Sequence, residues 1–288
     1  MITRNYYYLI AGLPDIVADE KKLSFTSVEF REILCDNLHK DDFELAKLYY
    51  MPYDHKNLLN LLFKKDSDWD TRGNEPKEII EKVSNQKSFE LADDVKLQSY
   101  LNEFLKKYYS EDGFTDYFAS EFALTSAYYN YLLESSNKFV KEVALHDRLT
   151  GNIMAALSGR KHELDYENNL IGEDEITASI KKSRARDFGI SGEVPEIEIL
   201  AQIYETENLV DREFKLDLYK WRYLDEKTFF NYFTIEKVLA YIQKLFIAER
   251  WYGLDKDKGR IMFNKILEDL KAGFYLPDEY TITYGKKK

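Results

Sequence analysis

The stretch YDHKNLLNLLF (residues 53–63) places Asp54 beside His55, a pairing that can move protons or bind a metal ion. It follows Pro52 and continues into leucines at helical spacing, so a helix is expected to begin here. Neighbouring side chains on a helix diverge by about 100°, so the acid and the histidine do not share a face. We therefore expect Asp54 to cap the helix through the N–H of residue 56 or 57, with His55 exposed.

His146 and Asp147 form a second such pair, and the same divergence separates their side chains. Neither pair has a third ligand at metal spacing, so no metal site is expected, and His146 is expected to be buried with its hydrogen bonds satisfied. An enzyme that brings Asp54, His55, His146 and Asp147 together through its fold is an alternative hypothesis. A helical adaptor protein is another.

Helical periodicity runs along most of the chain. The clearest helix spans residues 136–157 and is expected to end at Gly159, with the small residues Ala144, Gly151 and Ala155 on its inward face. A second begins after Thr234 and ends near residue 251. Other helices are expected at residues 25–48, 54–66, 76–84, 93–109, 114–133, 173–186, 195–206, 208–221 and 258–271. The fold class is therefore all-α.

Only the two ends of the chain have β-like composition. Residues 6–10 (YYYLI) and 280–284 (YTITY) are short and rich in aromatic or β-branched residues. The sequence therefore allows a small two-stranded β element that these two segments form together.

Composition narrows the class of protein. The chain has 288 residues, 44% of them hydrophobic, and a single cysteine, Cys35, which fits a reducing cytoplasm. A formal net charge of −11 argues against nucleic-acid binding, and no apolar run approaches the ~20 residues of a membrane span. Residues 181–186 (KKSRAR) and 286–288 (KKK) are locally basic; we expect solvated faces, with binding to an acidic partner as the alternative.

Three segments resemble the C/d subunit family of V-type and A-type rotary ATPases. Asp54 and Asn57, followed by two leucines, resemble the family's D-x-x-N-L helix motif. Residues 144–161 (ALHDRLTGNIMAALSGRK) are similar to its second copy through Asn152 and the tail LSGRK, although Leu149 holds the acidic position and Asp147 is displaced from it.

The third segment, residues 233–254 (FTIEKVLAYIQKLFIAERWYGL), supplies Glu249 as the acid, and Tyr252 stands in place of the asparagine. The acids recur roughly every hundred residues. The resemblance implies a single domain over residues 1–288, a funnel-like body of three related helical units with approximate bounds 1–90, 91–190 and 191–288. The chain looks like a divergent relative, similar to the branch of unknown function encoded beside bacterial V-type ATPase genes.

The resemblance also implies a function. A non-catalytic subunit of the central stalk links the membrane rotor ring to the central shaft and transmits torque during ion or proton transport. It has no cofactor, lies on the cytoplasmic side, and contacts the membrane only through the complex. A P-loop and a G-x-S-x-G elbow are both absent from the sequence. Partner-facing residues are then expected at Gly151, Ala155, Lys181, Lys182, Arg184 and Arg186.

Overall fold

The computed structural model describes residues 4–18, 22–85, 97–111, 113–114 and 116–254. Within these residues the chain is all-α and contains no strand, which confirms the predicted fold class. The helices are α1 (Tyr7–Ala11), α2 (Ser27–Asn37), α3 (Lys40–Lys47), α4 (Met51–Leu62), α5 (Lys77–Ser84), α6 (Ser99–Tyr108), α7 (Tyr117–Leu133), α8 (Lys138–His162), the 3₁₀ turn η1 (Glu167–Asn169), α9 (Glu175–Lys182), α10 (Ile197–Tyr204), α11 (Leu209–Lys227) and α12 (Ile235–Gly253).

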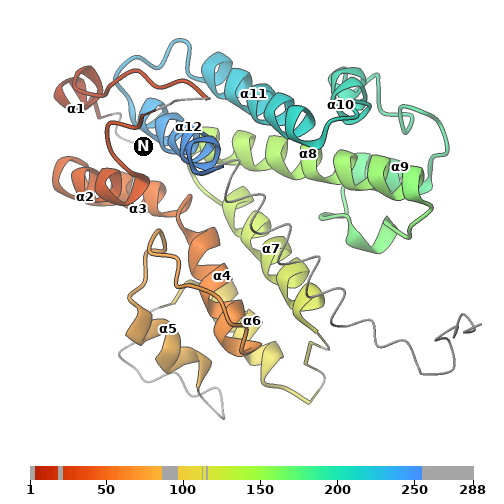
Figure 1. The fold of residues 1–288 in the computed structure, drawn as a ribbon, viewed down its shortest axis with the longest axis horizontal. Helices are drawn as coiled ribbons and strands as arrows, with labels where there is room; N and C mark the ends of the chain where they lie inside the picture. Colours follow the sequence, from red (N-terminus) through yellow and green to blue (C-terminus); the bar gives the residue numbers. More distant parts are fainter. Residues whose placement is uncertain (1–3, 19–21, 86–96, 112, 115, 255–288) are drawn as a thin grey trace, which may run out of the picture.

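The long helix α8 joins two hydrophobic cores. Its first half supplies Phe139, Val140 and Val143 to the larger core, which α2, α4, α6, α7 and α12 also build. Its second half supplies Ile153 and Ala156 to a smaller core under α9 and α10. Figure 1 shows the consequence, since α9 and α10 lie at one end of α8 while α4, α5 and α6 extend away from the other end.

Helix α12 packs against α2 and α3, far away in the sequence. Its inward residues Val238, Leu239, Ile242 and Leu245 are buried, as the sequence pattern predicts. The last described helix therefore lies against helices near the N-terminus, and α2 and α3 lie beside α12 in Figure 1.

Residues 6–10 correct one expectation. They were expected to be extended, yet Tyr7–Ala11 forms α1, and the Tyr6 N–H donates to the carbonyl oxygen of Phe233 at 2.7 Å. Contact with the turn before α12 thus overrides the β propensity of the tyrosines. The expected strand at residues 280–284 and the expected helix at residues 258–271 lie outside the described residues.

Two glycines of α8 also differ from expectation. The helix does not end at Gly159 but continues to His162, where Glu163 takes the left-handed conformation (φ 53°). Gly159 is instead buried under Tyr166, whose side-chain carbon lies 2.4 Å from where a Cβ would be. Gly151, expected to face a neighbouring helix, is exposed and has nothing within 4 Å of its Cβ position.

Candidate functional site

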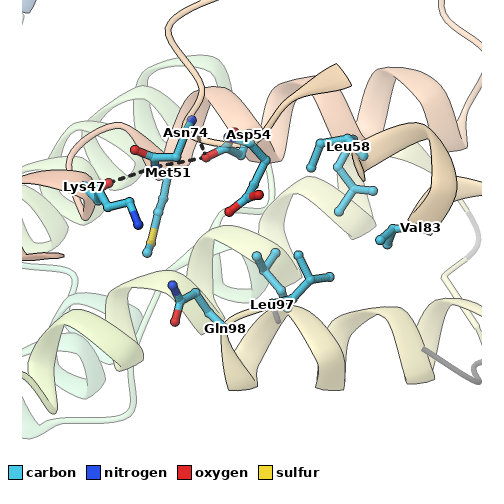
Figure 2. A pocket seen from close by; sticks show the side chains of 11 residues that line it. Lys47, Met51, Asp54, Leu58, Asn74, Val83, Leu97 and Gln98 are labelled. Carbon is cyan, nitrogen blue, oxygen red and sulfur yellow. Dashed lines mark hydrogen bonds between the residues drawn. The ribbon is translucent and has the colours of Figure 1, made fainter. Parts of the chain in front are cut away.

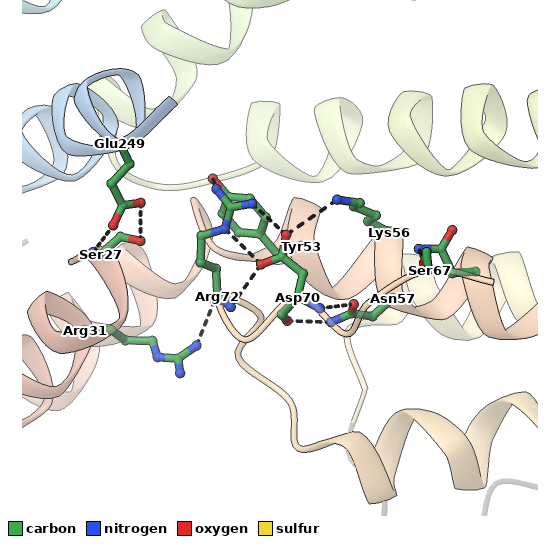
Figure 3. A network of polar contacts seen from close by, with 10 residues as sticks. Ser27, Arg31, Tyr53, Lys56, Asn57, Ser67, Asp70, Arg72 and Glu249 are labelled. Atoms are coloured by element: carbon green, nitrogen blue, oxygen red, sulfur yellow. Dashed lines mark hydrogen bonds and ion pairs between the residues drawn. The ribbon is translucent and has the colours of Figure 1, made fainter. Parts of the chain in front are cut away.

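Asn57 holds a loop against α4. Its Nδ2 donates to the Asp70 carbonyl oxygen at 2.8 Å, and the Asp70 N–H donates to its Oδ1 at 2.9 Å (Figure 3). The side chain is only 2% exposed, so both polar atoms of the amide are satisfied inside the protein. This pair fixes the connection between α4 and α5.

Asn152 makes the same pair of bonds on α8. Its Nδ2 donates to the Ile171 carbonyl oxygen at 2.8 Å, and the Ile171 N–H donates to its Oδ1 at 2.8 Å. Here the loop lies between α8 and α9. Asn57 and Asn152 therefore hold the loops that follow their helices through the same pair of hydrogen bonds.

Asp54 binds the loop between α4 and α5 and does not cap its own helix. Because α4 begins at Met51, Asp54 lies inside the first turn, and its carboxylate accepts the N–H groups of Asn74 and Glu75, each at 3.0 Å (Figure 2). The expected cap through residue 56 or 57 is thus wrong. Gly73 permits the approach, since a Cβ there would lie 2.4 Å from the Asp54 Oδ1.

Burial is the largest influence on the Asp54 carboxyl and raises its pKa to about 6, although the N–H donors of Glu75 and Asn74 act in the opposite direction. The cavity beside it has a volume of about 30 Å³ (Figure 2). Ligand pockets usually have about 300–1,000 Å³, so this cavity has room for a water molecule or two and is too small for a substrate of ordinary size.

His55 is buried, contrary to expectation. Its Nε2 lies 2.6 Å from the Tyr100 hydroxyl, and the rings of Tyr100 and Tyr128 meet it edge to face. Burial lowers the pKa of His55 to about 3, which keeps the imidazole neutral at physiological pH. The histidine therefore belongs to an aromatic core.

The second pair lies against α11. His146 stacks on Tyr223 with ring centroids 3.8 Å apart, and its Nδ1 lies 3.4 Å from Asp147. Its Nε2 is buried and has no hydrogen-bond partner among the described residues. The expectation of a satisfied histidine thus holds for one ring nitrogen only. Asp147 accepts a hydrogen bond from the Lys220 ammonium at 2.7 Å.

Burial pushes the pKa of Asp147 upward, but the Lys220 ammonium and the His146 contact outweigh it, so the pKa lies below its usual value. Among the described residues, no hydrogen bond or salt bridge joins Asp54 or His55 to this second pair. The same part of the chain contains no group of three or more His, Cys, Asp or Glu that could hold a metal ion.

Glu249, the third acid of the predicted series, reaches the start of α2. Its carboxylate accepts the Ser27 N–H at 2.5 Å and the Ser27 hydroxyl at 2.7 Å (Figure 3). From α2, Arg31 donates to the carbonyl oxygens of Arg72, at 2.8 Å, and of Gly73. Polar contacts thus join α12 to the start of α2, and α2 to the loop that α4 holds.

A cavity of about 690 Å³ is lined by residues of α4, α7, α8, α11 and α12. Each helix that carries a predicted motif contributes to its wall, with Tyr53 from α4, Asp147 from α8 and Glu249 from α12. Neither Gly151 nor Ala155 is among the described residues that line it; Ala155 packs against the smaller core instead.

Sequence analysis did not predict three further residues that line this cavity. Lys220 pairs with Asp147, while the Tyr49 hydroxyl and both polar atoms of the Gln243 amide are buried without a partner among the described residues. Gln243 is 4% exposed. Its residue type alone suggests a surface position on α12, and only the tertiary structure shows that it is buried.

The predicted basic residues lie elsewhere. Lys181, Lys182 and Arg184 line a separate groove beside the end of α8, whereas the exposed Arg186 pairs with Glu205 at 3.0 Å. No helix in the described part of the chain has the length and apolar composition needed to cross a membrane.

Comparison with known proteins gives one match. Residues 3–274 match the model of the family described as "Protein of unknown function (DUF2764)". No curated protein and no solved structure matches the chain. The match covers most of the chain, so this protein belongs to the DUF2764 family.

Proposed function

We propose that this chain is a non-catalytic subunit of the central stalk of a V-type rotary ATPase, placed between the membrane rotor ring and the central shaft. The observation that carries the proposal is the cavity lined by residues of α4, α7, α8, α11 and α12, a set that includes the three helices that carry the motifs. Its volume of about 690 Å³ and its mixture of tyrosines with charged groups suit the insertion of a shaft end.

Torque transfer requires a rigid cavity wall, and hydrogen bonds and ion pairs between the helices support such rigidity. Asn57 and Asn152 tie each motif helix to the loop that follows it. Glu249 ties α12 to α2, while Lys220 ties α11 to Asp147 on α8. A force on one helix is thereby shared with its neighbours.

The charged groups of this wall are engaged in structural pairs. Asp147 pairs with Lys220, and Arg250 with Asp217. Such pairs join α8 to α11 and α11 to α12 beside the cavity. In this proposal the ring, the shaft and this chain rotate together, and their rotation drives ion transport. The chain itself lies on the cytoplasmic side of the membrane.

The test fills the cavity without disturbing the fold. Gly253, at the end of α12, lines the cavity, and no described residue lies within 4 Å of its Cβ position, so the Cβ of Gly253→Trp fits there and its ring adds bulk at the cavity. Gly151→Trp is the matched control, since Gly151 is equally open but lies outside the cavity lining. Both variants are reconstituted with the ring and shaft subunits in membrane vesicles.

We expect Gly253→Trp to lower ATP-driven ion pumping and co-purification with the shaft, while Gly151→Trp leaves both unchanged. ATP hydrolysis by the detached catalytic head is expected to stay constant in every case. Failure of the unaltered chain to co-purify with ring and shaft subunits contradicts the proposal and favours the adaptor hypothesis. Unimpaired pumping after removal of the chain contradicts it as well.

A further inference from the structure

A basic groove lies where the ends of α8 and α9 come together, apart from the central cavity. Its volume is about 540 Å³, and its lining includes the cations Arg160, Lys181, Lys182 and Arg184 with Glu167 as the one carboxylate among the described lining residues. In a chain of net charge −11, such a local excess of positive charge stands out.

Arg160 is built into the floor of this groove. Its guanidinium donates to the carbonyl oxygens of Ala185, at 2.5 Å, and Ser183, and to the Tyr166 hydroxyl at 3.3 Å. It also lies over the ring of Phe188, 3.8 Å from the centroid. All these partners are neutral, so the charge is held in a fixed position and no carboxylate cancels it.

The other three cations are not neutralised either. Among the described residues, Lys181, Lys182 and Arg184 form no salt bridge, whereas nearby Arg186 pairs with Glu205. The C-terminal end of a helix attracts cations, which accounts for Lys181 and Lys182 in the last turn of α9. It does not account for Arg184, which lies beyond that turn and still lines the groove.

We propose that this groove binds an acidic polypeptide segment of a partner protein. Carboxylates complement its cations, and a narrow segment fits a concave site. A flat anionic membrane fits less well, because the exposed acids Glu163, Asp165 and Glu167 flank Tyr166 in the sequence and oppose a broad anionic surface.

Nucleic acid fits less well for a different reason. Single strands bind through bases stacked on exposed aromatic rings. Of the two rings beside Arg160, Phe188 is fully buried and Tyr166 is half-buried with its hydroxyl bonded. The inference concerns a separate surface and does not depend on the rotary function.

The probe is a fluorescein-labelled peptide of alternating glutamate and glycine, titrated with the full-length chain. The test variant is Lys182→Glu with Arg184→Glu. Both side chains are exposed, and neither makes a hydrogen bond or salt bridge with another described residue. The control is Lys40→Glu with Lys64→Glu, the same change of charge at exposed sites outside the groove. Phosphatidylserine vesicles and single-stranded oligothymidine serve as competing ligands.

We expect saturable binding of one peptide per chain, weakened about tenfold or more by Lys182→Glu/Arg184→Glu and unchanged by the control pair. Added salt is expected to weaken the binding, because exposed charges are screened. Equal loss in both variant pairs, no binding to the peptide, or tighter binding to vesicles or oligothymidine each overturns the proposal. Circular dichroism verifies that each variant stays helical.

Discussion

A carboxamide side chain offers one donor group and one acceptor group, which makes it a match for the backbone N–H and C=O of a single residue. Asn57 and Asn152 use both groups in this way, on Asp70 and Ile171. A leucine of similar size cannot, and it leaves the buried peptide group unpaired.

Replacing either asparagine with leucine is therefore expected to lower the free energy of unfolding by about 1–3 kcal/mol. Urea titration of Asn57→Leu and Asn152→Leu measures this, with Asn168→Leu as a control because Asn168 is exposed. The control is expected to stay within about 0.5 kcal/mol of the wild type. Equal stability of all three variants contradicts the role assigned to the two asparagines.

Adjacent buried groups on α4 respond to pH in opposite directions. The folded protein lowers the pKa of His55 to about 3, so its contribution to stability is complete above pH 6.5 and is lost as the pH falls from there towards 3. It raises the pKa of Asp54 to about 6, so that contribution is greatest below pH 3.8 and is lost as the pH rises towards 6.

His55→Phe isolates the first of these effects. Between pH 7 and pH 5 the unfolding free energy of the wild type is expected to fall by about 2 kcal/mol more than that of the variant, because only the wild type has the histidine that the unfolded chain protonates. Tyr100→Phe serves as the control, since it removes the hydrogen bond but keeps His55 surrounded by rings. Identical pH slopes in the wild type and His55→Phe contradict a neutral buried histidine.

At the scale of the element, α8 shows that glycine in a helix can serve two unrelated purposes. Gly159 admits the ring of Tyr166, whose hydroxyl then meets Arg160. Gly151 is exposed, and no described residue outside its own helix lies within 4 Å of its Cβ position, so it lowers helix stability without allowing any close packing.

Alanine substitutions at these two glycines are expected to change the free energy of unfolding in opposite directions. Gly159→Ala forces Tyr166 aside, and we expect a net loss of about 1–3 kcal/mol in unfolding free energy. Gly151→Ala is expected to raise it by about 0.5–1 kcal/mol through helix propensity alone. Urea denaturation of both proteins measures the difference, and a stabilised Gly159→Ala variant refutes the packing account.

Local sequence predicted helices well and their ends less well. The apolar stripe of α12 and the cap position of Thr234 were evident from spacing. The end of α8 was not, because a glycine resembles a helix stop until Tyr166, in the following loop, is known to cover it. His55 was misjudged for the same reason, since the rings that bury it come from α6 and α7.

At the scale of the whole molecule, a contact between α12 and α2 joins segments that lie far apart in the sequence. The Glu249 carboxylate binds Ser27, which lies 222 residues earlier and begins α2. A carboxylate suits that position because the first N–H groups of a helix have no partner inside the helix and carry partial positive charge.

Removal of this carboxylate in Glu249→Ala is expected to lower the unfolding free energy by about 1.5–3 kcal/mol, the usual cost of losing hydrogen bonds to a charged group. Hydrogen exchange at the first turn of α2 is expected to accelerate. Ser27→Ala is the milder control, as it removes the hydroxyl contact and keeps the backbone one. Unchanged exchange in α2 contradicts a role for Glu249 in holding the start of that helix.

The same contact has a consequence for synthesis on the ribosome. At about 5–20 residues per second, the 222 residues that separate Ser27 from Glu249 take roughly 10 to 45 seconds to translate. During that interval the apolar residues Phe30 and Leu34 of α2 have emerged while α12, which covers them in the finished protein, does not yet exist. A nascent chain of this protein is therefore expected to recruit chaperones to its first helices until its last turns of α12 are made.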